Sequence, residues 1–300
     1  MAGLSRVLFE CLFMRPSFIE PMLPTLVDEP PEGDDWIHEI KHDGYRTELV
    51  IDAGKVQAFP RRGADWTAKY GQVVADAGAL PAKSAIIDGE MTLLNAEGRS
   101  DYHGFRRAIK ASPGRLVFVA FDLLMLDGKD IRAETTLERR ERLQILLNDA
   151  PASIQFSEAI QGGGKAFYDA ADAMGLEGIV SKRAAAAYVS GRTRAWLKIK
   201  SFMVSELEVA GVLAERGKPT MALMVDRQNN YMGGAFITNR KIKERLLARV
   251  RSKAGPMPKG MKVKPDAQWL QPGVMARIRH LRGEEELRHA SVNEIISDDS

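Results

Sequence analysis

The sequence predicts an α+β protein with two domains: mixed helices and strands up to residue 200, then a small β-barrel that carries one helix. Three observations support this prediction. The chain has 300 residues, 45% hydrophobic and 28% charged, and is therefore long enough to bury two cores. Strand-like and helix-like stretches alternate first, and short strands dominate later. Residues 1–200 hold 26 basic and 28 acidic groups, whereas residues 201–300 hold 17 and 12.

The first domain is expected to contain a hairpin and at least two helices. Residues 47–52 (TELVID) and 55–60 (KVQAFP) have strand composition and flank a turn at Gly54. The stretch LERRERLQILLNDA, from Leu137, has helical spacing and strong helix formers. KAFYDAADAMG predicts a second helix closed by Gly175, and the short apolar strand GIVSK follows it.

The second domain is expected to be built from short strands such as ELEVAGVL and TMALMV. One helix interrupts these strands. Asn239 is its expected N-cap, and Ile242, Leu246 and Val250 recur on one face. This pattern favours a small β-barrel with a single covering helix.

Charge is distributed unevenly within the second domain. Residues 201–283 hold 16 basic and 6 acidic groups, a net charge of +10, while the tail from Glu284 holds 1 and 6, a net charge of −5. A basic module favours a polyanion as partner. Lysines that only keep a surface soluble would give the same count, so both interpretations stay open at this point.

Composition argues against several classes of protein. Residues 7–14 (VLFECLFM) are apolar but shorter than the roughly 20 residues of a membrane helix, so no membrane or targeting segment is expected. Cys11 is the only cysteine, which excludes a disulfide framework within one chain and fits a reducing cytoplasm. The five histidines lack zinc spacing, so structural or surface roles are expected. Residues 1–17 are expected to be an N-terminal arm, because MRPSFIEPM, from Met14, would itself make a sensible start.

The stretch WIHEIKHDGYR, residues 36–46, contains the main candidate for a catalytic group. A lysine amine is a poor nucleophile while protonated, so a reactive Lys41 needs burial or nearby cations to lower its pKa. Arg46, Lys198 and Lys200 could supply these cations, and the Asp-Gly turn would fold Arg46 back towards the lysine. An ordinary surface lysine is the alternative.

Five further motifs follow in order. They are PRRGADWT (60–67), IIDGEM (86–91), FVAFDLLMLDGKDIR (118–132), EGIVSKR (177–183) and WLKIK (196–200). This ordered set resembles the covalent nucleotidyltransferase superfamily, and within it the ATP-dependent DNA ligases. The resemblance implies a nucleotidyltransferase (adenylation) domain with antiparallel sheets and helices over residues 18–200. It also implies an oligonucleotide/oligosaccharide-binding (OB-fold) barrel that binds DNA over residues 201–300.

The resemblance implies a three-step reaction that begins at Lys41. The lysine would attack the α-phosphate of ATP, expel pyrophosphate and become lysyl-AMP. AMP would then pass to the 5′-phosphate at a nick, and the 3′-hydroxyl would displace it. Phosphoryl transfer needs cations around the phosphates and carboxylates that hold Mg²⁺, with Mn²⁺ as a substitute, and the motifs provide both.

Positions that match the family motifs are expected to form the ATP site. Glu39 would accept from the adenine amino group, and Phe121 would stack on the ring. Glu90 and Glu177 would hold the metal ion. The other nucleotide-binding residues are expected to be Ile40, Arg46, Arg61, Lys182, Arg192, Lys198 and Lys200, with Lys198 on the α-phosphate. Without the resemblance, Phe121 would be assigned to the core, Glu90 to a turn and Arg192 to a solvated loop.

The C-terminal segment departs from the family pattern. Ligases of this type end near Arg-x-Asp-Lys, whereas this chain has NEIISDDS, with Ile296, Asp298 and Asp299 near those places. Carboxylates beside a triphosphate should weaken ATP engagement. One alternative is therefore a nick-binding accessory protein, or a ligase deficient in self-adenylation. An RNA ligase or capping nucleotidyltransferase is less favoured, because EGIVSK and FDLLMLDG resemble the DNA ligase versions.

The resemblance is to the minimal ligase module of bacterial non-homologous end-joining ligases. It implies nicked or broken double-stranded DNA as substrate, in DNA repair or end joining. Ku and separate polymerase or nuclease modules are the implied partners. We expect a monomer in the bacterial cytoplasm, associated with the nucleoid. Residues 201–283 are the main candidate for gripping the duplex, with binding that weakens steeply with salt.

Overall fold

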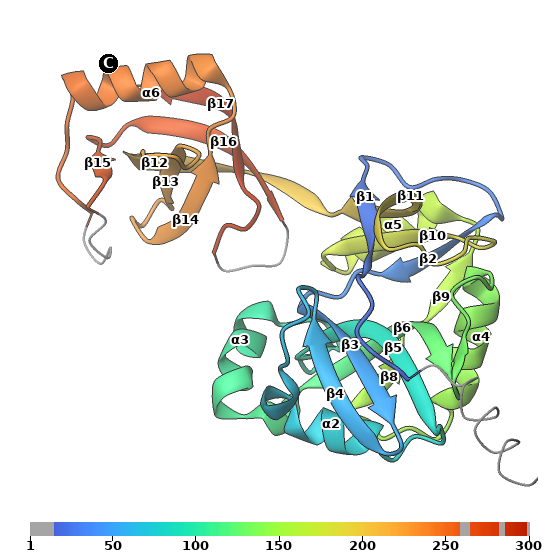
Figure 1. Cartoon of the computed structure of the whole chain (residues 1–300). Coiled ribbons are helices and arrows are strands. Elements are labelled where there is room, and N and C mark those ends of the chain that lie inside the picture. Colours follow the sequence, from blue (N-terminus) through green and yellow to red (C-terminus); the bar gives the residue numbers. More distant parts are fainter. Residues whose placement is uncertain (1–14, 259–264, 282–285, 299–300) are drawn as a thin grey trace, which may run out of the picture. The chain divides into compact units, whose positions relative to one another are not determined.

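The structure is a computed structural model of the chain and describes residues 15–258, 265–281 and 286–298. Its contacts form two compact units, one up to Lys200 and one from Ser201 (Figure 1). Residues 1–14 of the expected arm, with Cys11, lie outside the described residues, and so does Asp299. Within the described ranges, no helix is long and apolar enough to cross a membrane.

The first unit contains two sheets. The β2 sheet has the order β1-β11-β10-β2-β9 and consists of β1 (Met22–Leu26), β2 (Trp36–Ile40), β9 (Ala159–Gln161), β10 (Gly178–Arg183) and β11 (Gly191–Lys200). The β5 sheet has the order β4-β3-β5-β6-β7, with β8 paired to β6. Its strands are β3 (Tyr45–Asp52), β4 (Lys55–Pro60), β5 (Ser84–Thr92), β6 (Val117–Leu126), β7 (Lys129–Asp130) and β8 (Ile154–Phe156).

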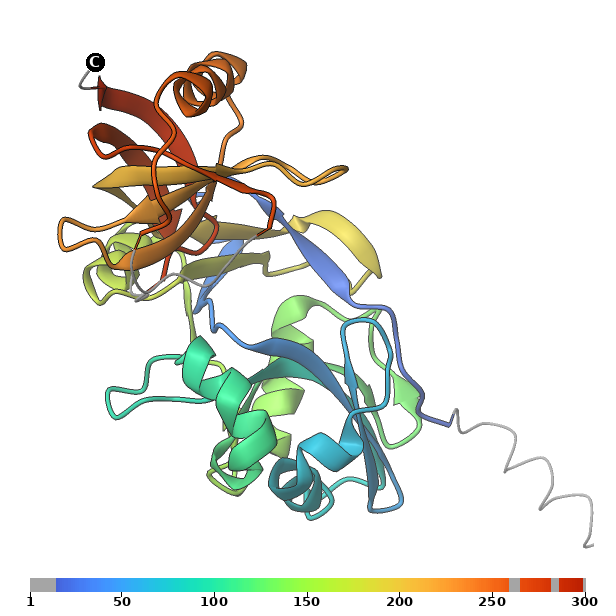
Figure 2. The same cartoon turned by 90° about the vertical axis from the view of Figure 1, so that its left-hand side faces the viewer.

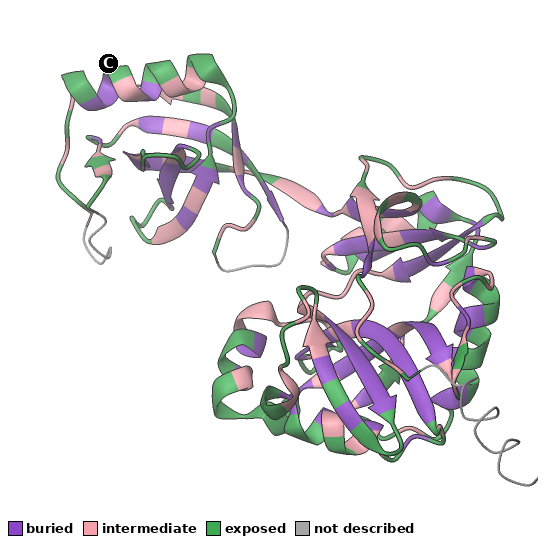
Figure 3. Ribbon diagram, in the orientation of Figure 1, coloured by how far each residue is buried: buried purple, intermediate pink, exposed green. Residues whose placement is uncertain are grey.

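Helices pack against these sheets. They are α2 (Gly71–Ala77), α3 (Tyr102–Ala111), α4 (Thr136–Leu146) and α5 (Gly164–Ala173), with the 3₁₀ turns η1 (Thr67–Lys69) and η2 (Pro113–Arg115). Side chains of α2, α3 and α4 share one core cluster with the β5 sheet, and α2 and α3 are seen beside that sheet in Figure 1 and Figure 2. Helix α5 packs on the β2 sheet. The long strands of the β5 sheet are largely buried (Figure 3).

Strand pleating sorts the side chains of the β5 sheet onto two faces. On β5, Ala85 and Ile87 enter the helix-covered core, whereas Ile86 packs in the cluster between the two sheets. Because side chains alternate along a strand, Asp88 and Glu90 continue the face of Ile86. Gly89 lies on the other face, where a Cβ would be 2.4 Å from the Phe118 ring. The Asp-Gly-Glu motif thus directs two carboxylates towards the β2 sheet.

The expected elements of the first unit are confirmed. Strands β3 and β4 pair from Thr47–Pro60 to Asp52–Lys55, with the turn at Gly54. Helix α4 begins at Thr136 with a reciprocal capping box between Thr135 and Glu138. Helix α5 ends just before Gly175, whose φ of +73° suits glycine, and β10 follows.

The second unit is a small barrel. Its elements are β12 (Phe202–Leu213), β13 (Met221–Val225), β14 (Tyr231–Phe236), α6 (Arg240–Ser252), β15 (Ala267–Trp269), β16 (Val274–Leu281) and β17 (Ser291–Asp298). The order β13-β14-β17-β16-β12 closes on itself, because β12 also pairs with β13. The Asn239 side chain caps α6, and Leu246 and Val250 are buried in the barrel core. The α+β class and the covering helix are therefore confirmed.

Glu48 on β3 makes the stability of the chain dependent on pH. Its side chain is buried, Oε1 accepts from the Ile19 N–H at 2.8 Å, and Oε2 has no hydrogen-bond partner among the described residues. Burial, and then the charge of Asp88, raise the pKa of Glu48 from 4.5 to about 8. Because the folded-state pKa is the higher one, the folded chain binds this proton more tightly than the unfolded chain.

The stabilising effect of that proton is complete below about pH 4.5 and disappears as the pH rises through about 8. Near pH 9 we expect the free energy of unfolding of Glu48→Gln to exceed that of the parent by on the order of 3 kcal/mol. Near pH 4.5 the two free energies should be nearly equal. Urea unfolding of both proteins across this range measures the difference. A difference that does not change with pH would refute the assignment.

Candidate active site

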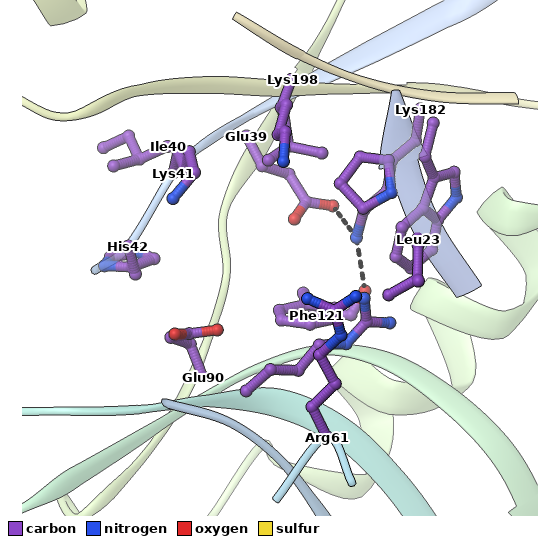
Figure 4. A pocket seen from close by; sticks show the side chains of 14 residues that line it. Leu23, Glu39, Ile40, Lys41, His42, Arg61, Glu90, Phe121, Lys182 and Lys198 are labelled. Carbon is purple, nitrogen blue, oxygen red and sulfur yellow. Dashed lines mark hydrogen bonds and ion pairs between the residues drawn. The ribbon is translucent and has the colours of Figure 1, made fainter. Parts of the chain in front are cut away.

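A pocket of about 200 Å³ lies between the facing sides of the two sheets of the first unit (Figure 4). The β2 sheet and its adjoining loops contribute Leu23, Pro24, Glu39, Ile40, Lys41, His42, Val180, Lys182, Trp196 and Lys198. The β5 sheet and the segment after β4 contribute Arg46, Arg61, Glu90 and Phe121. Most of the expected site residues therefore line one cavity. Glu177 and Lys200 contact each other beside it, and the exposed Arg192 donates instead to the Pro24 carbonyl at 3.4 Å.

Lys41 follows directly after β2. Its backbone N–H donates to the Gly178 carbonyl at 3.0 Å and so extends the pairing of β2 with β10. Only glycine fits at position 178, where φ is +141° and a Cβ would lie 2.0 Å from the Ile199 carbonyl oxygen. Glu177 precedes this glycine, and its Oε2 lies 2.5 Å from Lys41 Nζ. Strand pairing thus brings together two residues that are 136 positions apart.

The charges around Lys41 reverse the expectation of a lowered pKa. Burial by itself lowers the pKa of Lys41, but the carboxylates of Glu177, Glu90 and Asp43 together raise it above 10.5. The pKa values of the nearby Lys198 and Lys200 are lowered instead. Burial is the largest cause for both Lys198 and Lys200, and the charge of Lys41 lowers the pKa of each of them further. The structure therefore holds Lys41 as an ammonium paired with Glu177.

Glu90 approaches the same end of the pocket from the β5 sheet (Figure 4). Burial raises the pKa of Glu90 to about 8, although Lys41 and Arg46 act in the opposite direction. His42 also lines this end, and burial lowers its pKa to about 4, so it is neutral near pH 7. Among the described residues, no group of three or more histidine, cysteine, aspartate or glutamate side chains is arranged to hold a metal ion.

Arg46 lines the same pocket as Lys41, and its side chain is held in place by Asp88. Its guanidinium binds both oxygens of Asp88, at 2.9 and 2.5 Å, and donates to the Met22 carbonyl at 2.5 Å. It also lies 5.3 Å from the centre of the Phe121 ring. Asp88, which anchors Arg46, was not predicted from the sequence. The two-residue spacing from Asp88 to Glu90 in IIDGEM could have revealed it, because both then lie on the same face of the strand as each other.

At the other end of the pocket, hydrogen-bonded and ion-paired side chains surround the Phe121 ring. Glu39 is 2% exposed, and its Oε1 binds Arg140 at 2.6 Å and Lys182 at 2.8 Å. Lys182 Nζ donates to the Phe121 carbonyl at 3.1 Å and lies 4.5 Å from the centre of the Phe121 ring. Burial lowers the pKa of Lys182. This network fixes the Glu39 carboxylate beside the ring.

Arg140, on α4, is the second residue that the sequence analysis missed. Besides Glu39 it donates to the carbonyls of Ser157, at 2.5 Å, and Phe121, at 3.3 Å. In the sequence it stands in the strongly charged stretch LERRERL, which resembles a solvated helix. The leucine spacing of that helix would have placed Arg140 next to its buried side, but no local pattern indicates its partner.

The two ends of the pocket differ in chemistry. One end offers a ring face and a fixed hydrogen-bond acceptor, which suit a flat polar base. The other end brings Lys41 and Lys198 together with Glu90, and Glu177 and Lys200 adjoin them. Cations and carboxylates in such proximity suit an anionic group that travels with a divalent cation.

The chain is similar in sequence to DNA ligase domains. The model of the ATP dependent DNA ligase domain matches residues 21–200. The chain is 30% identical over 283 residues to the multifunctional non-homologous end joining protein LigD of Pseudomonas aeruginosa, covering 88% of this chain and 34% of that protein. It is 30% identical over 198 residues to the SPbeta prophage-derived DNA ligase-like protein LigB of Bacillus subtilis, covering 65% and 72%. The chain thus spans about a third of the length of the first relative.

Solved structures agree with the fold. The crystal structure of the ligase domain of Mycobacterium tuberculosis LigD has 25% sequence identity and a TM-score of 0.59, covering 92% of this chain and 94% of that one. A mycobacterial DNA ligase D complexed with ATP and MES gives the same TM-score at 24% identity, covering 94% and 96%. These structures share the mixed α+β architecture described above.

Proposed function

This chain belongs to the family of ATP-dependent DNA ligases, and we propose from this premise that it seals nicks in double-stranded DNA through AMP carried on Lys41. The observation that carries the proposal is the pocket itself. Within the matched residues, it joins an ion-paired lysine, further cations, the Glu90 carboxylate and a ring with a fixed acceptor, and Glu177 adjoins it. Each of these groups has a role in phosphoryl transfer from a nucleotide.

We propose that ATP enters with adenine at the end formed by Glu39 and Phe121. Glu39 would accept from the amino group and Phe121 would stack on the ring. The phosphates would then extend towards Lys41 and Lys198, since cations neutralise charge there. Ile40, Arg46, Arg61, Lys182, Arg192 and Lys200 would complete the nucleotide site.

Mg²⁺, or Mn²⁺ in its place, fits the carboxylates at the Lys41 end of the pocket. Proteins usually hold Mg²⁺ through one or two carboxylates together with substrate phosphates, so a cage of three protein ligands is not required. Glu90 and Glu177 come from separate segments and act on the same ammonium of Lys41. We propose that these two residues would hold the ion, which when bound supplies positive charge for the phosphates.

The proposed chemistry starts when Lys41 loses a proton to solvent. Nζ then attacks the α-phosphorus and loses a second proton to solvent as the P–N bond forms, while the bond from the α-phosphorus to the bridging oxygen breaks and pyrophosphate leaves. An oxygen of the 5′-phosphate at the nick next attacks the same phosphorus, and the P–N bond breaks as the Lys41 nitrogen takes up a proton from solvent. Finally the 3′-hydroxyl attacks the activated 5′-phosphate, gives up its proton and releases AMP.

We assign the second unit as an OB-fold barrel that grips the duplex. Five of its six described strands, all except β15, close into a ring, and α6 stands between β14 and β16 in the chain, which supports this assignment. On β17, Ile296 is 38% exposed. Ile296 and Asp299 stand near the places where the family usually carries its two cations, so we propose that the phosphates depend more strongly on Lys198 and Lys200.

We also propose that the chain acts in end joining as a monomer. It would work with Ku and with polymerase or nuclease modules, in the bacterial cytoplasm close to the nucleoid. The name of the P. aeruginosa relative, a non-homologous end joining protein, supports this role.

Sealing of a singly nicked duplex with ATP and Mg²⁺ tests the proposed function. We expect a ligated strand, and the same product without ATP when the nick is already adenylated. Sealing of the adenylated nick alone would indicate a ligase deficient in self-adenylation. No product from either substrate would favour the accessory protein, and preference for an RNA nick would favour the RNA ligase.

Arg140 is expected to determine how well the pocket recognises adenine. Arg140→Met removes a charged hydrogen bond to Glu39, which is worth roughly 1.5–3 kcal/mol, or about 10- to 100-fold in affinity. We expect the KM for ATP in self-adenylation to rise by this factor and the preference for ATP over GTP to fall. Arg142→Met, on the exposed side of the same helix, is the control. An unchanged preference in Arg140→Met would refute this role.

A further inference from the structure

The first unit has a second concave surface, which the proposed chemistry does not use. It has a volume of about 460 Å³ and lies where α3 meets β3 and the segment around η1. We call it the basic groove, and its lining residues are Tyr45, Trp66, Lys69, His103, Arg106, Arg107, Ile109 and Lys110. No carboxylate lines this groove, in contrast to the candidate active site.

The packing of helix α3 leaves its basic side chains exposed to solvent. The Asp101 side chain caps the helix by accepting from the Gly104 N–H at 2.7 Å. Gly104, Phe105 and Ala108 are buried, and the Phe105 ring packs edge-on against Tyr45 at 5.0 Å. These buried residues fix the face of α3 that packs on the core. The opposite face is exposed and carries Arg106, Arg107 and Lys110.

These cations lack the acidic partners that cations have elsewhere in the first unit. On α4, Arg139 pairs with Asp122 and Arg142 with Glu134. By contrast, Arg106, Arg107 and Lys110 form no salt bridge with any carboxylate in the described part of the chain. Arg106 and Lys110 also stand four residues apart on one helix, where like charges repel each other. Such a cluster is favourable when an external anion occupies the groove.

A separate segment brings a fourth cation to the same place. Lys69 Nζ lies 3.4 Å from the centre of the Trp66 ring, and that ring packs against Tyr45 at 5.7 Å. Tyr45 and Arg46 are neighbours on β3 and point to opposite faces, so Tyr45 lines the basic groove and Arg46 lines the pocket of Lys41. The groove therefore lies at the same end of β3 as the candidate active site.

We infer that the basic groove binds the sugar–phosphate backbone of duplex DNA beside the nick. This inference rests on the proposed function. Guanidinium groups match the oxygens of a phosphate, and contacts of this kind position a duplex without reading its sequence. The groove offers no carboxylate or amide acceptor that could select a base. It adds a DNA contact within the first unit to the one proposed for the basic barrel.

The triple variant Arg106→Ala/Arg107→Ala/Lys110→Ala tests the inference. We expect binding to a nicked duplex, measured by fluorescence anisotropy in about 0.1 M salt, to weaken by about 10- to 100-fold. The slope of log K against log salt should decrease in magnitude by about 2–3, roughly one for each lost phosphate contact. Labelling of the protein by ATP should be unchanged, because the three residues do not line the nucleotide pocket.

Two variants serve as matched controls. Lys55→Ala/Lys83→Ala/Lys129→Ala removes the same charge from exposed positions elsewhere in the first unit and should leave affinity and slope close to the parent values. Arg106→Lys/Arg107→Lys keeps the charge and should retain most of the salt dependence. Retained ATP labelling shows that a variant is folded.

Equal affinity and equal slope in the triple variant and in the parent would overturn the groove assignment, even if both seal nicks. A parent protein that binds no nicked duplex would overturn both this inference and the proposed function. Weakened binding with an unchanged slope would also contradict the inference, because phosphate contacts release counterions.

Discussion

Replacing Lys41 with alanine is expected to abolish transfer of AMP from ATP to the protein, with a loss of at least about 10³-fold in rate. Two other lysines, Lys182 and Lys198, line the pocket, and Lys200 lies beside it. The pKa values of all three are lowered, so a lysine other than Lys41 is chemically conceivable as the nucleophile. Lys41 nevertheless makes the closer contact with Glu177, at 2.5 Å against 3.4 Å for Lys200, and the charge of Glu90 also acts on it. Labelling with α-labelled ATP, followed by a denaturing gel, measures the transfer.

Lys41→Arg is the matched control, because it keeps a positive charge beside Glu177 but removes the amine. It should be folded and unlabelled, like Lys41→Ala. Both variants should still seal a nick that is already adenylated, since the lysine acts only in the transfer of AMP. Persistent labelling of either variant would mean that another residue accepts AMP.

Replacing Arg139 with methionine is expected to lower the free energy of unfolding by about 3–5 kcal/mol. Arg139 and Asp122 form an ion pair in which both side chains are 0% exposed, with two contacts of 2.8 Å. Arg139 also donates to the carbonyls of Glu134, at 2.7 Å, and Ala186, at 3.0 Å. The variant leaves the Asp122 carboxylate buried without its cation, and this accounts for the large effect.

Urea unfolding at pH 7 measures this loss. Arg139→Met/Asp122→Leu should recover part of it, because an apolar pair of similar volume removes the buried charge. Lys165→Met breaks the exposed pair of Lys165 with Asp169 and should change stability by no more than about 0.5 kcal/mol. A loss below about 1 kcal/mol in Arg139→Met would contradict the account of this pair.

Local patterns in the sequence were sufficient to predict several elements of the fold. The α6 helix could be predicted because its cap at Asn239 and its apolar spacing both lie within a short window. The family resemblance carried by the ordered motifs also predicted most of the pocket, since Lys41, Glu90 and Phe121 each stand in a distinctive stretch and line one cavity. These signals are local and need no knowledge of the partner strands.

Properties that depend on distant partners could not be predicted. The raised pKa of Lys41 results from Glu177, which only the pairing of β2 with β10 brings close. Arg140 belongs to a stretch that looks solvated, yet it binds Glu39, which is 101 positions away. The groove cations of α3 gain their significance only because the fold adds Lys69 to them and no carboxylate. In each case tertiary contacts, not residue type, decide the outcome.

Mass spectrometry of peptides from the ATP-labelled protein tests the central claim most directly. The account predicts one AMP attached through a phosphoramidate bond, located on Lys41. AMP located on Lys198 or Lys200, or ligation with ATP in the absence of any AMP on the protein, would contradict it.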